Sequence, residues 1–256
     1  MLCVLPCLLL APGGLAGEPI AKRTCSLDDV SRRGLLSRKE YFELGDCTTL
    51  DLADKKIGDV ESVRALAEAL KSNSGLTELI LRDNTVGYEG VRALAEALKA
   101  NSALTELNLG WTSIGYEGVR ALAEALKVNS ALTSLYLEGN SIDDKGAQAL
   151  AEALKVNSAL ITLDLYDNSI GAGGARALAQ ALKANRALAS LDLAANSIGD
   201  EGARALAETL KGNSTLTELN LKDNSIGDEG VRALGSWQQA VDGAVERIIK
   251  ANEKEL

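Results

Sequence analysis

The sequence predicts an α/β solenoid, a curved stack of repeated rows that forms a partial horseshoe. A parallel β-sheet lines its concave face and α-helices cover its convex face. Three observations predict this. Leucines recur every 28 residues through six consecutive rows, from Leu79 to Leu219. Each row opens with alternating leucines and continues with helical periodicity. One such unit cannot bury its own apolar side chains, so the rows must stack on one another.

The first part of each row predicts a short β-strand. In the segment Leu76 to Asn84 (LTELILRDN), the second and third leucines are two residues apart, so both point into the stack and their neighbours point outward. An asparagine closes this segment, and we expect its amide to satisfy backbone groups where the chain leaves the strand. The column contains Asn84, Asn140, Asn168, Asn196 and Asn224, and Thr112 interrupts it in the second of the six regular rows.

The second part of each row predicts a turn and an amphipathic helix. In one row, Ile198 can bury in the core and Gly199 can adopt backbone angles that are costly for other residues. Acidic residues begin these helices and lysine ends them, as the helix dipole favours. We expect the asparagine two residues beyond each lysine to end the helix in a left-handed conformation. The apolar stripe of this helix is Ala203, Leu206, Ala207 and Leu210, and the asparagines are Asn101, Asn129, Asn157, Asn185 and Asn213.

The 28-residue row with its long alanine- and leucine-rich helix resembles the ribonuclease-inhibitor-like class of leucine-rich repeats, which is also found in Ran GTPase-activating proteins and NOD-like receptors. The segment Asn196 to Asn213 (NSIGDEGARALAETLKGN) carries the resemblance most specifically, and the resemblance covers residues 47–235. It implies a concave sheet that binds proteins and a cytoplasmic location. It specifies a fold and no particular ligand.

Both ends of the repeat array depart from the pattern. Residues 47–55 predict a degenerate first row, in which Cys47 replaces the opening leucine and Leu50 lies 29 residues before Leu79. Residues 18–46 form a predicted N-terminal cap, with an amphipathic helix between residues 26 and 44. Residues 236–256 form a predicted C-terminal capping helix that includes Trp237. Terminal rows of solenoids need such caps to shield their apolar faces.

Residues 1–17 form a short apolar run that is too short to span a bilayer. It ends in small residues, as a secretory signal peptide does, but no lysine or arginine precedes it and two prolines interrupt it. A cleaved signal and a retained apolar arm are both open interpretations, and a cleaved signal would make the protein secreted. In an oxidising compartment Cys25 and Cys47 could form a disulfide; otherwise they are two buried thiols.

Composition excludes several classes of function. The chain has no histidine, the commonest general base and transition-metal ligand, and its four cysteines match no zinc or redox spacing. A net charge of −9 argues against binding to nucleic acid or anionic lipid and favours a partner with a basic surface. We expect no metal, no cofactor and a monomeric protein without a membrane span.

The candidate site follows from the outward positions of the strands, which vary while the scaffold hardly does. Aromatic residues appear there in neighbouring rows, and tryptophan and tyrosine are enriched among interface hot spots. Acidic residues surround them, which favours a basic partner or simply keeps the face soluble. The predicted partner-binding residues are Ile80, Arg82, Trp111, Tyr136, Glu138, Asp164, Tyr166 and Asp192.

The leading hypothesis is a module that binds a protein partner through its concave sheet. The alternative, suggested by the resemblance, is a regulator that inhibits or activates a partner enzyme such as a nuclease or a small GTPase. Catalysis by paired carboxylates such as Asp164 and Asp192 is disfavoured, because acidic residues repeat over an open surface without a pocket or a histidine. The sequence therefore predicts a protein that is not an enzyme.

Overall fold

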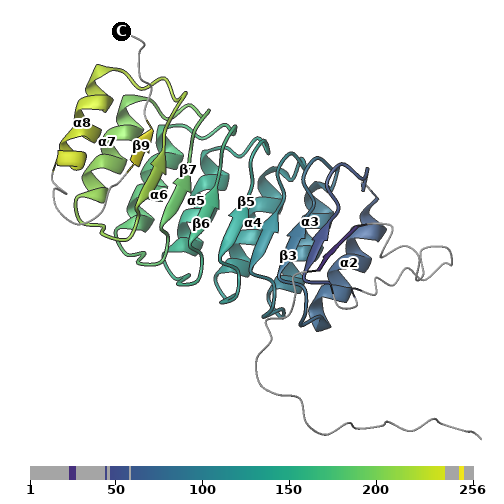
Figure 1. Ribbon diagram of the computed structural model, residues 1–256. Helices are drawn as coiled ribbons and strands as arrows, with labels where there is room; N and C mark the ends of the chain where they lie inside the picture. The colour runs from purple at the N-terminus through teal and green to yellow at the C-terminus, as the bar shows by residue number, and fades with distance from the viewer. Residues whose placement is uncertain (1–22, 27–43, 45–46, 58, 240–247, 251–256) are drawn as a thin grey trace, which may run out of the picture.

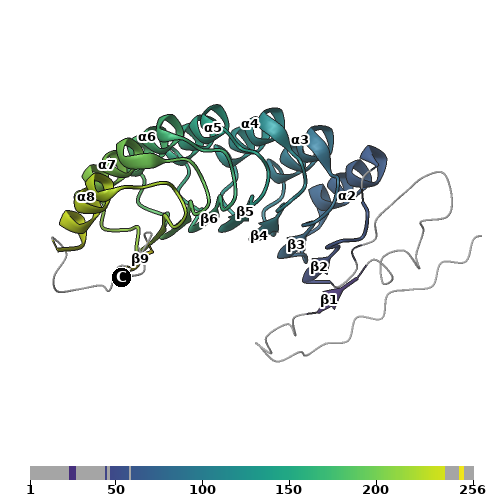
Figure 2. The same ribbon diagram turned by 90° about the horizontal axis from the view of Figure 1, so that it is seen from above.

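The computed structural model describes residues 23–26, 44, 47–57, 59–239 and 248–250. Over these residues the chain is a curved solenoid in which strands line the inner side and helices the outer side (Figure 1). Seen from above, the helices follow the outside of the arc and the strands its inside (Figure 2). The predicted α/β solenoid with a concave parallel sheet is confirmed.

All strands of the described chain belong to one parallel sheet whose spatial order follows the sequence. Equivalent leucines pair from row to row, as Leu107 pairs with Leu135, and the degenerate first row is in register through Leu50 and Leu79. The strands are β1 (Thr24–Cys25), β2 (Thr49–Asp51), β3 (Glu78–Ile80), β4 (Glu106–Asn108), β5 (Ser134–Tyr136), β6 (Thr162–Asp164), β7 (Ser190–Asp192), β8 (Glu218–Asn220) and β9 (Ile248–Lys250).

One helix follows each strand from β2 to β8 and buries its apolar stripe against the sheet. In the helix of residues 199–210, the predicted stripe from Ala203 to Leu210 is buried. Fully burying one leucine contributes about 1.5–3 kcal/mol, so several per row stabilise the stack. The helices are α2 (Val60–Ser72), α3 (Gly87–Leu98), α4 (Gly115–Leu126), α5 (Asp144–Leu154), α6 (Ala172–Leu182), α7 (Gly199–Leu210) and α8 (Asp228–Gln239).

The asparagines that close the strand segments form hydrogen bonds between rows, as predicted. The side-chain amide of Asn140 donates to the carbonyl of Leu109 in the preceding row at 2.8 Å, and its oxygen accepts from the backbone N–H of Thr112 at 3.1 Å. We call Asn84, Asn140, Asn168, Asn196 and Asn224 the strand-exit ladder. In the second regular row, the Thr112 hydroxyl bonds only within its own row and to Asn140, so the bond to the preceding row is lost.

The asparagines beyond the helix ends form a second ladder, and their predicted left-handed conformation is wrong. None of the five has a positive φ. The buried amide of Asn129 donates to the carbonyls of Leu98 and Asn101 in the preceding row and accepts from two N–H groups of the loop that leads into β5. We call Asn101, Asn129, Asn157, Asn185 and Asn213 the helix-end ladder. Because these amides are buried, they must satisfy their hydrogen bonds within the protein, and they do so by joining adjacent rows.

The turns before the helices are of three kinds. Before α2 and α5 an aspartate of the same row, Asp59 or Asp143, caps the helix by accepting from its first N–H groups. Gly199 has a φ of +61° and Ile198 is buried, as predicted. Before α6 and α8, however, a carboxylate of the preceding row caps the helix. Asp144 accepts from the N–H groups of Gly171 and Gly174, and Asp200 accepts from the equivalent glycines two rows later. Each such aspartate joins two rows at the helix starts.

At the N-terminal end the disulfide that the sequence left open is present, and at the C-terminal end part of the predicted capping helix is a strand. Cys25 and Cys47 form a disulfide, with their Cα atoms 5.8 Å apart, that fastens β1 to the first row. At the other end, residues 248–250 form β9 and pair with β8, so the capping helix predicted for residues 236–256 does not include them. The described part of the predicted helix is the end of α8, to Gln239. Residues 1–17 lie outside the described residues, and of the helix predicted between residues 26 and 44 only Ser26 and Leu44 are described.

Candidate functional site

The structure places the predicted site residues on the concave face in two adjacent columns. Ile80, Tyr136, Asp164 and Asp192 share one column, in which Tyr136 pairs with Asp164 and Asp164 pairs with Asp192. Arg82, Glu138 and Tyr166 occupy the column two residues further along, and Trp111 lies one position beyond that. The structure brings Trp111, Tyr136, Glu138, Asp164, Tyr166 and Asp192 together across β4 to β7. Ile80, on β3, lies at one edge of this group.

Trp111 lies at the exit of β4 with backbone angles that are unfavourable for a residue with a bulky side chain. Its φ is +50°, and the equivalent position is Asp83, Gly139, Asp167, Ala195 or Asp223 in other rows, all of which also have a positive φ. Asp and Gly tolerate left-handed angles, whereas a bulky residue there is an outlier. The indole is 37% exposed, and the Arg82 guanidinium lies 5.4 Å from its ring centre. Arg82 also pairs with Asp83.

Two glycines make room for Trp111 and Glu138. A Cβ atom at Gly139 would come within 2.2 Å of the Trp111 indole nitrogen, so this indole lies over Gly139 of the next row. A Cβ atom at Gly110 would come within 2.4 Å of the Glu138 carboxylate, so this carboxylate lies over Gly110 of the preceding row. Trp111 and Glu138 therefore cross between the same two rows, and each needs a glycine in the other row.

Glu138 is buried, with 7% of its surface exposed. Its Oε2 atom is fully buried and accepts no hydrogen bond from any described residue. A buried charged group without a donor is costly, and such groups in folded proteins call for an explanation. We call Glu138, Asp164 and Asp192 the central acidic cluster.

The other two carboxylates of the cluster are held by backbone and side-chain donors. Asp164 accepts from the N–H of Tyr166 at 2.8 Å. Asp192 accepts from the N–H of Ala194 and from the Asn220 amide, both at 2.8 Å. Burial, as the largest cause, and the charges of Asp192 and Glu138 together raise the pKa of Asp164 to about 6, against the opposing effect of the Tyr166 N–H.

The tyrosines lie beside these carboxylates. Burial raises the pKa of the Tyr136 phenol, and the carboxylates of Glu106, Asp164 and Glu138 add to this rise against a hydrogen bond with Ser134. Tyr166 is 40% exposed, so its ring is open to contact. Sequence reasoning missed Gly110, Gly139 and Asn220. Gly110 and Gly139 could have been noticed in the sequence, because most other rows carry a side chain at the same positions.

This face offers carboxylates, hydrogen-bonding groups and partly exposed aromatic rings. The described residues contain no group of three or more cysteine, aspartate or glutamate side chains placed to hold a metal ion. None of the described helices is both long and apolar enough to cross a membrane.

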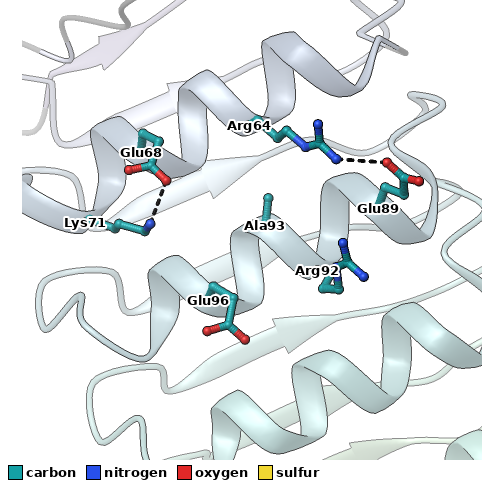
Figure 3. Close-up of a pocket in the computed structure, with 7 residues that line it drawn as sticks. All are labelled: Arg64, Glu68, Lys71, Glu89, Arg92, Ala93 and Glu96. Atoms are coloured by element: carbon teal, nitrogen blue, oxygen red, sulfur yellow. Dashed lines mark hydrogen bonds and ion pairs between the residues drawn. The ribbon is translucent and has the colours of Figure 1, made fainter.

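The convex face carries two open grooves, each of about 500 Å³, between α2 and α3 and between α3 and α4. Figure 3 shows the first groove, where Arg64 of α2 pairs with Glu89 of α3 at 3.0 Å and Lys71 pairs with Glu68 within α2. Exposed ion pairs of this kind contribute about 0–1 kcal/mol each. Charges of both signs line these grooves and largely pair with one another, so we assign no site there.

Comparison with solved structures finds similar folds. The leiomodin-1 structure entitled "Actin-Binding Site 2" is 26% identical over 57% of this chain and 86% of that chain, with a TM-score of 0.49. The tropomodulin C-terminal domain of Caenorhabditis elegans is 16% identical over 59% of this chain and 92% of its own, with a TM-score of 0.51. A Bacteroides fragilis protein is 15% identical over 80% of this chain and 65% of its own, with a TM-score of 0.46. At this identity the tropomodulin likeness shows the fold alone.

A search of curated proteins finds no match. A family model described as leucine-rich repeat matches six successive segments that together cover more than half of the chain. They are residues 72–95, 100–123, 128–151, 156–179, 184–207 and 212–235. Their spacing is that of the rows, and each segment includes one strand of the concave sheet. The chain belongs to the leucine-rich-repeat family.

Proposed function

We propose that this protein is a binding module that holds a protein partner against the centre of its concave face, and that it acts by binding rather than by catalysis. The observation that carries the proposal is Trp111. Its backbone occupies a left-handed conformation that other rows reserve mainly for aspartate and glycine, and its indole is still partly exposed. Strained conformations of this kind cluster at functional sites.

The surroundings of Trp111 support a macromolecular interface. Tyr166, two rows away, is exposed to a similar degree, and Tyr136 lies half-buried between them. Aromatic side chains bury large areas at a modest entropic cost, which is why they anchor protein interfaces. The backbone beneath them is fixed by the sheet and the two asparagine ladders, so the face is largely organised before a partner arrives.

Charge favours a partner with a basic surface. The central acidic cluster lies among the aromatic residues, and the basic residue beside Trp111, Arg82, is itself paired with Asp83. Complementary charge would accelerate association and would lose effect as salt increases. Regulation of a partner enzyme would be a consequence of binding at this same face.

Affinity capture of partners, from a cell lysate and from a secreted-protein fraction, tests the proposal. The native chain is compared with a Trp111→Ala, Tyr136→Ala, Tyr166→Ala variant. The control is a Tyr88→Ala, Tyr116→Ala variant, which removes two exposed aromatic rings at the helix starts of the convex side.

We expect a partner that the control retains and the concave variant loses, with all three chains folded by circular dichroism. Equal capture by the native chain and the concave variant would contradict the proposal. Loss with the convex control alone would move the interface to the helix starts.

A further inference from the structure

We infer that the central acidic cluster binds the guanidinium group of an arginine side chain carried by the partner protein. This inference rests on the proposed function and specifies what the centre of the concave face recognises. It follows from four features: an unsatisfied buried carboxylate, the room built for it, the absence of a compensating cation, and the aromatic rings around it.

The unsatisfied group is the Glu138 carboxylate. Its Oε2 atom is buried and has no donor among the described residues. Nothing in the scaffold requires a glutamate here, because the equivalent position is arginine, glycine, tyrosine, alanine or lysine in other rows. A carboxylate that is kept without a donor in the free protein is explained by a donor that a ligand supplies.

The neighbouring row leaves room for this carboxylate. Gly110 lets it lie across the exit of β4, where any larger residue would collide with it. Gly139 lets the Trp111 indole cover the next row. Gly110 and Gly139, the two glycines that create this space, lie in the same two rows as Trp111 and Glu138. The four residues therefore form one arrangement.

The cluster has three carboxylates, and none of the ion pairs among the described residues involves them. Asp192 is fixed by the Ala194 N–H and the Asn220 amide. Asp164 receives the Tyr166 N–H on Oδ1, and no described residue donates to its Oδ2. The charges that act on Asp164 are those of Asp192 and Glu138, and both are negative. A bound cation would relieve this repulsion.

The shape of the site favours guanidinium over other cations. Guanidinium is planar, offers several donors in a fixed fork that matches carboxylates, and sheds water more readily than ammonium does. It also stacks on aromatic faces, and Tyr166 and Tyr136 flank the cluster. Arg82 shows this contact within the chain, since its guanidinium lies over Trp111. A metal ion is disfavoured, because the described carboxylates form no metal-binding group.

The test is a nuclear magnetic resonance titration of the full chain with N-acetyl-arginine methylamide, using N-acetyl-lysine methylamide as the comparison probe. We expect saturating shifts of the backbone amides of Glu138, Asp164 and Tyr166, and an affinity for the lysine probe at least several-fold weaker. Absence of saturating shifts at these amides, or equal affinity for both probes, would overturn the inference.

Variants assign the effect to the cluster. Glu138→Gln and Asp164→Asn should each weaken the arginine probe at least tenfold. Glu218→Gln removes the same charge from an exposed position on the same face, where the native carboxylate accepts a hydrogen bond from Ser190, and should bind as the native chain does. Native affinity in both cluster variants would overturn the inference. If Glu138→Gln does not fold, Asp164→Asn decides alone.

Thermal unfolding separates binding from a structural role. If Glu138 serves recognition, Glu138→Gln should unfold at the same or a higher temperature than the native chain while binding less. A lower unfolding temperature would mean that the charge stabilises the fold, and the inference would fail. If the probe does not bind but capture still depends on Trp111, Tyr136 and Tyr166, the inference fails and the proposed function stands.

Discussion

The two asparagine ladders differ in one row, and the difference marks the candidate site. The helix-end ladder continues without a break from Asn101 to Asn213. The strand-exit ladder, on the concave side, is broken at Thr112. That residue directly follows Gly110 and Trp111, the residues that interlock with Glu138 and Gly139 of the next row.

The comparison shows where this chain follows the repeat pattern and where it departs from it. Away from the concave centre, the first five regular rows repeat the same buried leucines and the same helix-end asparagine. At the exits of β4 and β5 the chain accepts a missing row-to-row bond, a tryptophan at positive φ and a buried carboxylate without a donor. Several local rules broken together are the expected sign of a functional region.

The intact ladder should be the more costly one to disrupt. Asn129→Ala removes two donors and two acceptor contacts at a buried position between rows. We expect the free energy of unfolding to fall by about 3 kcal/mol or more, because the carbonyls and N–H groups left behind are buried without partners. Urea unfolding measures this. The exposed neighbour Ser130→Ala is the control, and an equal effect of both changes would show that the ladder does not stabilise the stack.

Removing the buried charge at the centre should act in the opposite direction. We expect Glu138→Gln to raise the free energy of unfolding by about 1–2 kcal/mol, since an uncharged amide loses less than a carboxylate when it is buried without a donor. Urea unfolding beside Glu218→Gln, which should change little, measures the gain. A loss of stability would mean that the scaffold depends on the Glu138 charge.

Repairing the broken ladder should also stabilise the chain. Thr112→Asn places an amide where it can donate to the Leu81 carbonyl of the preceding row, as Asn140 does to Leu109. We expect a gain of about 1 kcal/mol, the usual net value of one hydrogen bond. Thr112→Ser, which keeps a hydroxyl, is the matched control. If Thr112→Asn is no more stable than native, the packing beneath Trp111 excludes an amide and the break is steric.

The smallest expected effect is a pH dependence at Asp164. Its pKa in the folded chain is about 6, above the ordinary aspartate value of 3.8, so between these pH values the folded state keeps a proton that the unfolded state has released. Stability should therefore fall as pH rises from about 4 to about 6, because Asp164 then ionises beside Glu138 and Asp192. Asp164→Asn should remove this fall and raise the unfolding temperature by about 2–4 °C at pH 7. Thermal scans of both chains at pH 4 and pH 7 measure this. If the difference in unfolding temperature between the two pH values is the same for the native chain and for Asp164→Asn, the prediction is contradicted.

The repeat made most of the fold predictable. A fixed 28-residue period places every leucine, and the alternation within each strand decides which residues face outward. The strand-exit ladder followed from the same column, including its break at Thr112. The helix-end asparagines were misassigned because a local capping pattern does not show that the residue is buried against the preceding row. Ile248 was assigned to a helix although it lies in a strand, because an apolar run this short is equally consistent with a strand or a helix.

The site was only partly predictable. The outward positions of Tyr136 and Tyr166 follow from strand alternation. Trp111 lies beyond β4 at a positive φ, and alternation alone does not predict that its ring is exposed. The burial of Glu138 does not follow from alternation either, because it depends on Gly110 in another row and on how the Trp111 and Glu138 side chains cross. This crossing depends on how two neighbouring rows pack, and the sequence of one row does not show this.

Hydrogen–deuterium exchange of the native chain, with and without the captured partner, tests the central claim most directly. The account predicts added protection at the ends of β4 to β7 and the turns that follow them, and none along the outer helices α2 to α8. Protection confined to the helices, with the concave strand ends unchanged, would contradict the claim that the centre of the concave face binds the partner.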